Sequence, residues 1–450
     1  MNPTRFLLLA CLFLSTTFSF AANQPMRIAT FSVDATPPLG SPLAYDPMIA
    51  TGTPLSCKGI VIYGDRKPVI LCAVDWIGIG SSGQIAFKEA FAEAVGTDPE
   101  RVTVHTLHQH DAPRCNFAAD DLLKEQGLTG MAFNVAHARK VIRDAAAAAK
   151  AAPQEAITHV GHGTAEVKEI ASNRRIMGPD GKVRATRWTA CRSPELRALP
   201  VGTIDPELST VSFWFEDECR AVLSYYACHP QSYYRTGAPS PDFPGLARNQ
   251  REEESGIPHI HFNGAGGNIG AGKWNDGSKE NRPVLVNKLA TAMKESLNNT
   301  KKQGVNSGFL HWHVEPVLMP PSTAIDEAAL RETISNIKAT PAVRYAAAKE
   351  LDWYLRCQRK EPVNLTCLQI GSNRVLHMPG ELLVEYQLWA KEQKPNLSIA
   401  MAAYGDYSMG YIAPSKAYDE GGYEASARAS KVAPEVEGVL KEAMKKLLSR

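Results

Sequence analysis

Residues 68–108, PVILCAVDWIGIGSSGQIAFKEAFAEAVGTDPERVTVHTLH, carry the pattern that decides the fold. The apolar run at 68–76 predicts a strand, the amphipathic segment 84–95 predicts a helix, and the alternating segment 101–108 predicts a second strand. The same two patterns recur along the chain. Further strands are predicted at 208–216, 221–227 and 259–262, and further helices at 136–152, 283–297, 326–339 and 434–448. Such interleaving predicts an α/β fold of mixed β-sheets flanked by helices.

The sequence predicts one large domain behind an export signal. The first residues, MNPTRFLLLACLFLSTTFSFAANQP, combine a basic start, a short apolar run and small residues at a cleavage point. This pattern predicts a signal peptide over residues 1–21, and hence a secreted or periplasmic protein. An N-terminal membrane anchor is the alternative. Residues 22–450 show no repeat, linker or shift in composition, so we expect a single domain there.

Charge and cysteine content narrow the range of partners. The chain has 49 Lys and Arg residues against 47 Asp and Glu residues, and this near-neutrality argues against a nucleic-acid partner. Peripheral contact with a membrane stays open, although no segment beyond the leader is long and apolar enough to span one. Eight of the nine cysteines follow the leader. An even number in an exported chain permits disulfides, and we expect Cys357 to pair with Cys367.

Three histidines stand within six positions in VTVHTLHQHDAP, residues 102–113. If the strand continued, His108 and His110 would share one face and His105 would lie on the other. Two close imidazoles suit a metal ion, although most such histidines are only hydrogen-bonded. The same applies to two further alternating pairs, His259 with His261 and His311 with His313, which we keep outside the candidate site.

Four further stretches contain candidate functional residues. His229 ends the apolar strand in YYACHPQS, and the glycine-dense turn HFNGAGGNIGAGK (261–273) follows another strand. Glycines allow backbone N–H groups to approach a ligand closely. LHMPGELLVEYQLWAKE predicts a helix with Glu381 in its first turn, where an acid also stabilises the helix dipole. AMAAYGDYSMGYIAP ends a strand in a loop that carries Tyr407 and Tyr411. Two histidines and a carboxylate form a donor set that suits zinc.

These motifs, in this order, resemble the catalytic domain of the neutral/alkaline, non-lysosomal ceramidases, zinc-dependent amidases that split the N-acyl bond of ceramide. HQHDAP resembles that family's His-x-His-Ser-Gly-Pro segment, HPQS its His-Pro-Thr-Ser and MPGE its Pro-Gly-Glu. The resemblance spans roughly residues 26–445. It implies that zinc is bound by His108, His229 and Glu381, and that His110 lies beside the substrate.

Two other segments extend the resemblance. GYIAPSKAYDEGGYE is similar to the segment that supplies the family's zinc-binding tyrosine, which implies Tyr411 as a further ligand. Asn173 and Arg174 resemble the Asn-Arg pair that the family uses near its substrate. The resemblance therefore implies a catalytic role for Arg174.

The chain also departs from the family pattern. Where the family has Gly-Asp-Val-Ser, with the serine assigned as nucleophile, this chain has GNIG, residues 267–270. Gly270 thus replaces the serine, and we expect Asn268 and Gly270 to line the substrate site instead. We expect no counterpart here of the family's smaller C-terminal β-sandwich domain. We therefore interpret the chain as a divergent relative rather than a ceramidase proper.

The expected function is hydrolysis of a small or lipid-like N-acyl amide, or of an ester, by an exported zinc enzyme with metal-bound water as nucleophile. His110 would serve the leaving group, and Arg174 would stabilise an oxyanion or a substrate carboxylate. Asp111 or Asp406 would orient a metal-bound histidine. A catalytically inactive binding protein on the same scaffold is the alternative. A dinucleotide-dependent oxidoreductase rests on the glycine turn alone, which lacks the expected acidic residue about 20 positions later.

Overall fold

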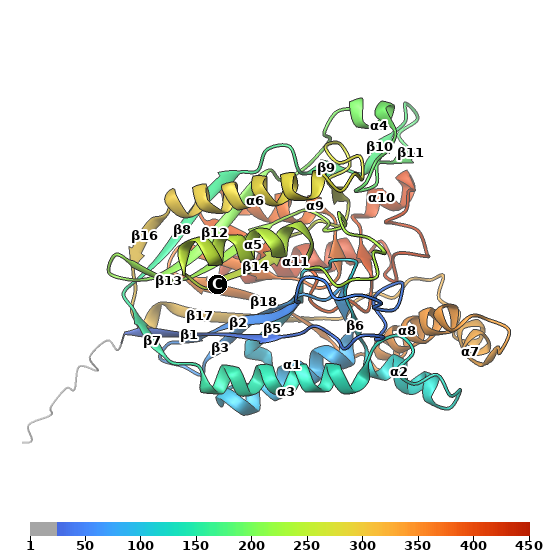
Figure 1. Cartoon of the computed structure of the whole chain (residues 1–450), viewed down its shortest axis with the longest axis horizontal. Helices are drawn as coiled ribbons and strands as arrows, with labels where there is room; N and C mark the ends of the chain where they lie inside the picture. Colours follow the sequence, from blue (N-terminus) through green and yellow to red (C-terminus); the bar gives the residue numbers. More distant parts are fainter. Residues whose placement is uncertain (1–24) are drawn as a thin grey trace, which may run out of the picture.

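The computed structural model describes residues 25–450, so the expected signal peptide lies outside the described residues. Three mixed sheets form its centre (Figure 1). The first contains, in spatial order, β5 (Val102–Thr106), β3 (Val69–Val74), β2 (Ser56–Tyr63), β1 (Met26–Asp34) and β7 (Glu155–Ile157). The second contains β14 (His259–Asn263), β13 (Glu218–Tyr226), β12 (Glu207–Phe215), β8 (His159–Glu166) and β16 (Lys301–Gly304). The third contains β17 (Leu310–Val317), β18 (Val363–Ile370), β19 (Asn373–His377) and β21 (Ser398–Ala402).

Short two-stranded ladders connect the loops. They are β4 (Gly78–Ile79) with β6 (Arg114–Cys115), β9 (Ser172–Asn173) with β15 (Ile269–Gly270), β10 (Arg175–Met177) with β11 (Val183–Thr186), and β20 (Glu381–Leu382) with β22 (Tyr411–Ile412). The helices lie outside the sheets. They are α1 (Ser81–Val95), α2 (Phe117–Lys124), α3 (Val135–Ala151), α4 (Pro194–Ala198), α5 (Asp242–Ser255), α6 (Asn281–Asn298), α7 (Glu327–Ser335), α8 (Pro341–Gln358), α9 (Val384–Gln393), α10 (Ser415–Glu420) and α11 (Val436–Ser449).

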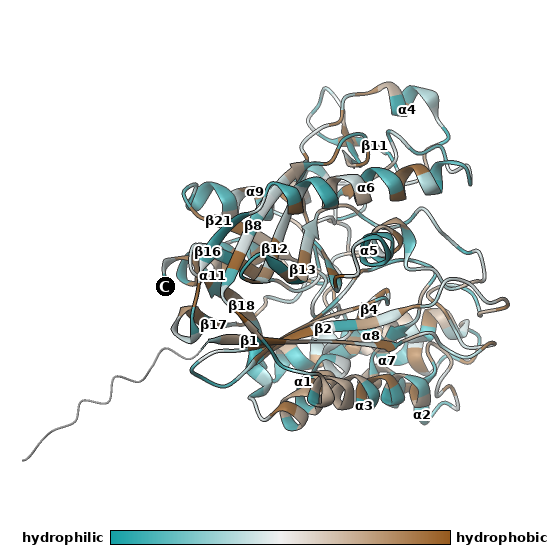
Figure 2. Ribbon diagram, turned by 60° about the vertical axis from the view of Figure 1, so that its left-hand side comes forward, coloured by the Kyte–Doolittle hydropathy of each residue, from teal (hydrophilic) through white to brown (hydrophobic). Residues whose placement is uncertain are grey.

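The layering follows from strand alternation. Every residue of β3 is buried, and its side chains divide between two cores. Ile70, Cys72 and Val74 face the core beneath α1 and α3, while Leu71 and Ala73 face the core shared by the three sheets. A strand buried on both faces gives a continuous apolar run, which is why this segment was recognisable. Helices α1 and α3 cover the first sheet, and α5 and α6 cover the second (Figure 1). The outer helices α3 and α6 alternate apolar and polar residues (Figure 2).

The expected α/β fold of mixed sheets flanked by helices is confirmed, and two local expectations are wrong. Strand β5 ends at Thr106, so His108 and His110 do not alternate along a strand. Glu381 lies in the short strand β20, and the following helix starts at Val384. Among the described residues, no helix is long and apolar enough to cross a membrane.

The expected disulfide is also absent. Cys357 and Cys367 are free thiols, as are the other cysteines of the described chain. Cys367 lies in β18, in the core that α11 covers, whereas Cys357 is half-buried near the end of α8. Burial raises the pKa of Cys367 to about 12, so the thiol stays protonated at neutral pH. Both residues therefore act as small apolar side chains.

The strand directions indicate where a ligand-binding site can form. Each sheet contains one parallel pair: β3 with β5, β13 with β14, and β19 with β21. The carboxyl ends of these pairs lie together, because β14 contacts both β5 and β21. The loops that follow parallel strands form the usual ligand-binding edge of such sheets. The motifs that contain His108, His229, Glu381 and Tyr411 fall in these loops, whereas Asn173 and Arg174 follow the antiparallel strand β8.

Histidines His259 and His261 of β14 make the fold sensitive to acid. Burial lowers the pKa of His259 to about 4 and that of His261 to about 3, whereas an unfolded histidine titrates near 6.5. Between pH 6.5 and about 4 the unfolded chain therefore binds more protons, and stability falls as pH falls. Each histidine contributes on the order of 1.4 kcal/mol per pH unit in this window. Chemical denaturation at pH 7 and pH 5 measures the loss.

A matched variant isolates one of the two histidines. His261 hydrogen-bonds the Ser224 hydroxyl at 2.9 Å, and glutamine can keep that bond without titrating. The His261→Gln variant is expected to show a shallower loss of unfolding free energy between pH 7 and pH 5. An unchanged slope would contradict a neutral buried His261.

Candidate metal and hydrolase site

The candidate residues stand in the segments that follow the parallel strands. His108 follows β5, His229 follows β13, Glu381 follows β19, and Tyr411 lies beyond β21. Backbone bonds join these loops: the Tyr404 N–H donates to the Gly380 carbonyl and the Glu381 N–H to the Gly410 carbonyl, each at 2.9 Å. All four candidate residues are buried. The fold thus brings together side chains that are far apart in the sequence.

A turn, not a strand, positions His108. Its φ is +65°, in the left-handed region that non-glycine residues rarely occupy. The His108 N–H donates to the Trp76 carbonyl at 3.0 Å, and its ring Nδ1 lies 2.6 Å from the Ile77 carbonyl oxygen. A carbonyl only accepts, so Nδ1 carries the hydrogen and Nε2 keeps its lone pair. That lone pair faces Glu381 Oε2 at 3.2 Å.

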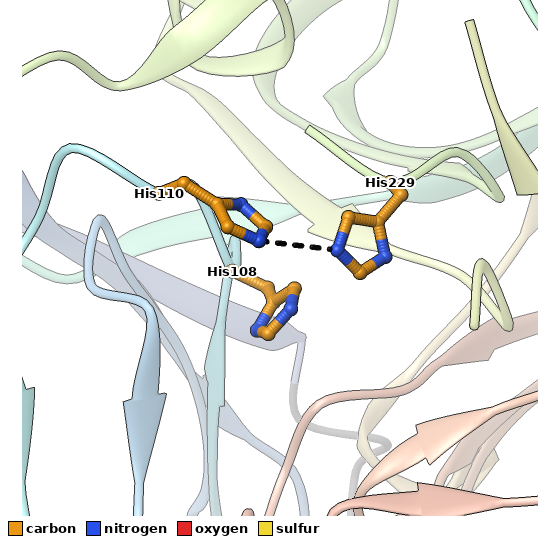
Figure 3. Close-up of side chains that lie close together, drawn as sticks. All are labelled: His108, His110 and His229. Atoms are coloured by element: carbon orange, nitrogen blue, oxygen red, sulfur yellow. Dashed lines mark hydrogen bonds between the residues drawn. The ribbon is translucent and has the colours of Figure 1, made fainter. Parts of the chain in front are cut away.

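His110 and His229 complete a cluster of three imidazoles (Figure 3). One nitrogen from each of His108, His110 and His229 lies within 4.8 Å of the others, so the three buried rings could hold a metal ion. The Nε2 atoms of His110 and His229 are 3.3 Å apart and share a hydrogen bond. His110 Nδ1 faces the Pro230 carbonyl oxygen at 3.1 Å and therefore carries the hydrogen on that ring. His229 Nε2–H is then the donor to His110, which leaves the lone pair of His229 on Nδ1.

The carboxylate of Glu381 faces two of these lone pairs. Its Oε2 lies 3.2 Å from His108 Nε2 and 3.9 Å from His229 Nδ1, and its Oε1 accepts from the Tyr407 hydroxyl at 2.9 Å. Neither Oε2 nor His229 Nδ1 has a hydrogen-bond partner among the described residues. An anion facing nitrogen lone pairs is unfavourable unless a cation lies between them. The donor set therefore fits a divalent metal ion.

Protonation states agree with metal binding. Burial and the neighbouring His108 lower the pKa of His110 to about 3 and that of His229 well below its usual value. Burial alone would raise the pKa of Glu381, but His108, Tyr411 and Tyr407 lower it to about 2. At neutral pH the rings of His110 and His229 are thus neutral and Glu381 is ionised, which are the forms that bind metals.

Arg174 lies beside this cluster. Its guanidinium is buried, donates to the Tyr411 hydroxyl at 3.1 Å, and pairs with Glu424 Oε1 at 3.0 Å. Although burial opposes the charge, Tyr411 and Glu424 raise the pKa of Arg174 above its usual value. A permanent cation is therefore held next to the expected metal-binding tyrosine.

Asn268 and Gly270 lie behind Arg174, outside the lining of the cavity. The Arg174 N–H donates to the Asn268 carbonyl at 2.8 Å, and the Asn268 side chain caps the start of α9 by accepting from the Val384 N–H at 2.9 Å. A Cβ atom at Gly270 would lie 2.8 Å from the Thr189 hydroxyl. Thr189 thus takes part of the space that a serine at position 270 would need.

The glycine turn is a packing element and not an anion cradle. The Gly267 N–H donates to the Leu382 carbonyl at 2.8 Å, and a Cβ at Gly267 would lie 2.6 Å from the Glu381 carbonyl oxygen. The turn leads into β15, and the next helix, α6, begins at Asn281. A dinucleotide site needs a helix directly after the glycines, so this geometry disfavours the oxidoreductase alternative.

Neither expected aspartate orients a histidine. Asp111 accepts from the Thr236 hydroxyl at 2.6 Å, and Asp406 pairs with Arg356. Backbone carbonyls fix the rings of His108 and His110 instead. A carbonyl and a carboxylate serve equally as acceptors for the second ring nitrogen, which is why the sequence did not distinguish them.

A cavity of about 540 Å³ opens onto the cluster. His108, His110, His229 and Glu381 form part of its lining. Aromatic side chains dominate the remainder: Tyr45, Trp188, Tyr234, Tyr407, Tyr411 and Tyr423. The lining has no aliphatic side chain larger than alanine. The cavity can thus take a small molecule, and planar or ring-shaped groups would stack well in it.

Sequence reasoning missed three residues. Tyr404 stacks on the His108 ring with centroids 4.6 Å apart, and its buried hydroxyl has no partner among residues 25–450. Glu424 is the counter-ion of Arg174. Lys349 of α8 reaches the cavity from a helix on which no motif was recognised. Tyr404 could have been found, because it lies in the same recognised segment as Tyr407. No sequence motif pointed to Glu424 or Lys349.

Comparison with known proteins shows the fold without showing the family. No protein-family model and no curated protein matches the sequence. Two solved structures are similar: a ceramidase complexed with C2, with a TM-score of 0.66, and a neutral ceramidase from Pseudomonas aeruginosa, with a TM-score of 0.67. Each is 14% identical to this chain, and the alignment covers 94% of this chain and 74% of the other. The chain therefore has a ceramidase-like fold.

Proposed function

We propose that this chain is a zinc-dependent hydrolase of an N-acyl amide bond or of an ester bond. One observation carries the proposal: His108 Nε2 and His229 Nδ1 converge on Glu381 Oε2, at 3.2 Å and 3.9 Å, with no hydrogen bond to satisfy that oxygen among the described residues. Nitrogen and carboxylate donors suit zinc, and three protein ligands leave a position open at a catalytic site. The fold shared with solved ceramidases supports the same reaction class.

Each neighbouring residue has a role in this proposal. Zinc supplies an activated water and polarises the scissile carbonyl. The ring of His110 stacks on Tyr45 at 5.9 Å and lines the cavity. Its Nε2 lone pair would take up the proton of the attacking water and then deliver that proton to the leaving group. Arg174, which donates to the Tyr411 hydroxyl at 3.1 Å, would stabilise the developing oxyanion, and that hydroxyl would be a further ligand beside the three protein donors. Export by the predicted signal peptide would place the reaction outside the cytoplasm.

Metal analysis combined with turnover tests the proposal. Purified protein is expected to contain one zinc ion per chain and to hydrolyse members of a panel of N-acyl amides and esters. A chelator should abolish turnover, and added zinc should restore it. The His110→Ala variant should keep its zinc but lose turnover, whereas His108→Ala should lose both. Trace zinc in the wild type, or full zinc in His108→Ala, would contradict the assignment.

A binding protein is the second candidate. The observation that favours it is the Thr189 hydroxyl beside Gly270, which takes part of the space of the family's nucleophile. Zinc-loaded protein that binds amides without converting any of them would establish this alternative. Turnover of any substrate that a chelator stops would exclude it.

A further inference from the structure

A second, smaller cavity adjoins the site. It has a volume of about 130 Å³ and shares Tyr45, Lys349 and Tyr407 with the large cavity. Water occupies roughly 30 Å³ per molecule in the liquid, so this space suits a group of a few atoms. Lys349 stands at the junction of the two cavities.

The side cavity is lined by cations without anions. Lys349 and Arg114 both line it, and no Asp or Glu does. Neither cation forms an ion pair within residues 25–450. Of the other cations that line the large cavity, Arg174 pairs with Glu424, and Lys431 pairs with Glu350 at 2.6 Å. Arg428 also has no ion pair among the described residues, but it is exposed to solvent. Two half-buried, unpaired charges of one sign are costly unless an anion joins them.

Nearby groups compensate this positive charge only in part. Arg114 donates to the Ala44 carbonyl and lies over the Tyr345 ring, 5.5 Å from its centre, and Glu381 and Glu350 partly offset the positive charges around Lys349. Asp352 lies behind the lining and accepts from Asn116 Nδ2 at 3.0 Å. Glu381 faces the histidine cluster. Lys349 Nζ lies 5.1 Å from the centre of the Tyr407 ring, whose hydroxyl donates to Glu381. Burial and the charges of Arg114 and Lys431 lower the pKa of Lys349 to about 8, which leaves it mostly protonated at neutral pH.

We propose that Lys349 and Arg114 bind a carboxylate of the substrate, so that the preferred substrates are acidic N-acyl amides such as N-acyl amino acids. This inference rests on the proposed hydrolase function, because it assigns the substrate class of the same site. Lys349 Nζ lies 5.1 Å from the Tyr407 ring centre, and the His108 ring centre lies 5.3 Å from it, with all three residues lining the same cavity. A short molecule can therefore reach from Lys349 to the donor cluster. The carboxylate anchors one end of the substrate while the amide carbonyl faces the histidines and Glu381.

A binding experiment that needs no turnover tests the proposal. The probes are the ketomethylene analogue of N-octanoylglycine, in which CH2 replaces the amide N–H, and the corresponding primary amide. Calorimetric titration of the zinc-loaded full chain should show the acid binding about tenfold to a hundredfold more tightly, as expected for charge-assisted hydrogen bonds. Lys349→Gln and Arg114→Gln should each remove most of this preference, and Lys349→Arg should retain part of it.

Lys88→Gln is the matched control, because Lys88 is also a half-buried lysine without an ion pair in the described chain, but it lines a different cavity. It should keep the preference for the acid. Equal binding of the two probes by the wild type, or a preference that survives in both Lys349→Gln and Arg114→Gln, would overturn the proposal. A preference for the acid in a chain that hydrolyses no member of the amide and ester panel would instead refute the hydrolase and leave an anion-binding site.

Discussion

The Glu381→Gln variant is expected to lose zinc and about a thousandfold in turnover. Glutamine keeps the size of the side chain and can still accept from Tyr407, but it cannot supply the anionic oxygen that faces His108 and His229. Lewis-acid stabilisation is worth several kcal/mol, and each 1.36 kcal/mol is a factor of ten in rate. Zinc content by mass spectrometry and steady-state hydrolysis measure the two losses.

The metal-free variant should be at least as stable as the metal-free wild type. In the wild type, Glu381 Oε2 is buried without a partner among the described residues, whereas a glutamine N–H could donate to His108 Nε2 at the same place. Thermal melting in a chelator compares the two. If Glu381→Gln binds zinc as tightly as the wild type, Glu381 is not a ligand.

Glu385→Gln is the control for this experiment. Glu385 is also a carboxylate near the site, but it accepts from Asn268 Nδ2 at 3.0 Å and faces none of the histidines. Its amide variant should keep both zinc and turnover. Equal losses in the two variants would indicate a general disturbance of the loops.

The fold was predictable because the spacing of apolar residues along the sequence indicates which segments form strands and which form helices. Strand β3 is buried on both faces and gave an unbroken apolar run. The errors arose at strand ends, where tertiary contacts outweigh local pattern. Alternation continued through His108, but the backbone turns there, because its N–H bonds to Trp76 from another loop. Glu381 resembled a helix start, yet its N–H is taken by the Gly410 carbonyl, and it forms a short strand instead.

Some site residues could be predicted from a local motif, whereas others matter only through partners that are far away in the sequence. His108, His229 and Glu381 lie in motifs of recognisable type, and the structure brings them together. Their joint role as zinc ligands stays a prediction. Glu424 and Lys349 could not be found, since their importance comes from partners about 250 and 60 positions away in the chain. A single sequence contains no signal for such pairs.

Arg174 provides the second test with a large expected effect. It is buried against Glu424 and donates to the Tyr411 hydroxyl. Removing one member of a buried ion pair costs about 3–5 kcal/mol, and removing a donor aimed at the developing oxyanion costs about a hundredfold to a thousandfold in kcat. Arg174→Met should therefore show both losses. Arg174→Lys should recover much of the stability but little of the activity, because lysine lacks the planar fork.

A variant of the neighbouring Arg175 separates the loss of stability from the loss of catalytic rate. It pairs with the same Glu424, at 3.3 Å, and with Glu420, but no hydrogen bond joins it to Tyr411 among the described residues. Arg175→Met is thus expected to lower the unfolding free energy while leaving kcat within a few-fold of the wild type. A pH profile of kcat for Arg174→Lys adds a readout that a structural role would not change. If Arg174→Met and Arg175→Met lose activity only in proportion to their loss of folded protein, Arg174 supports the fold and plays no part in catalysis.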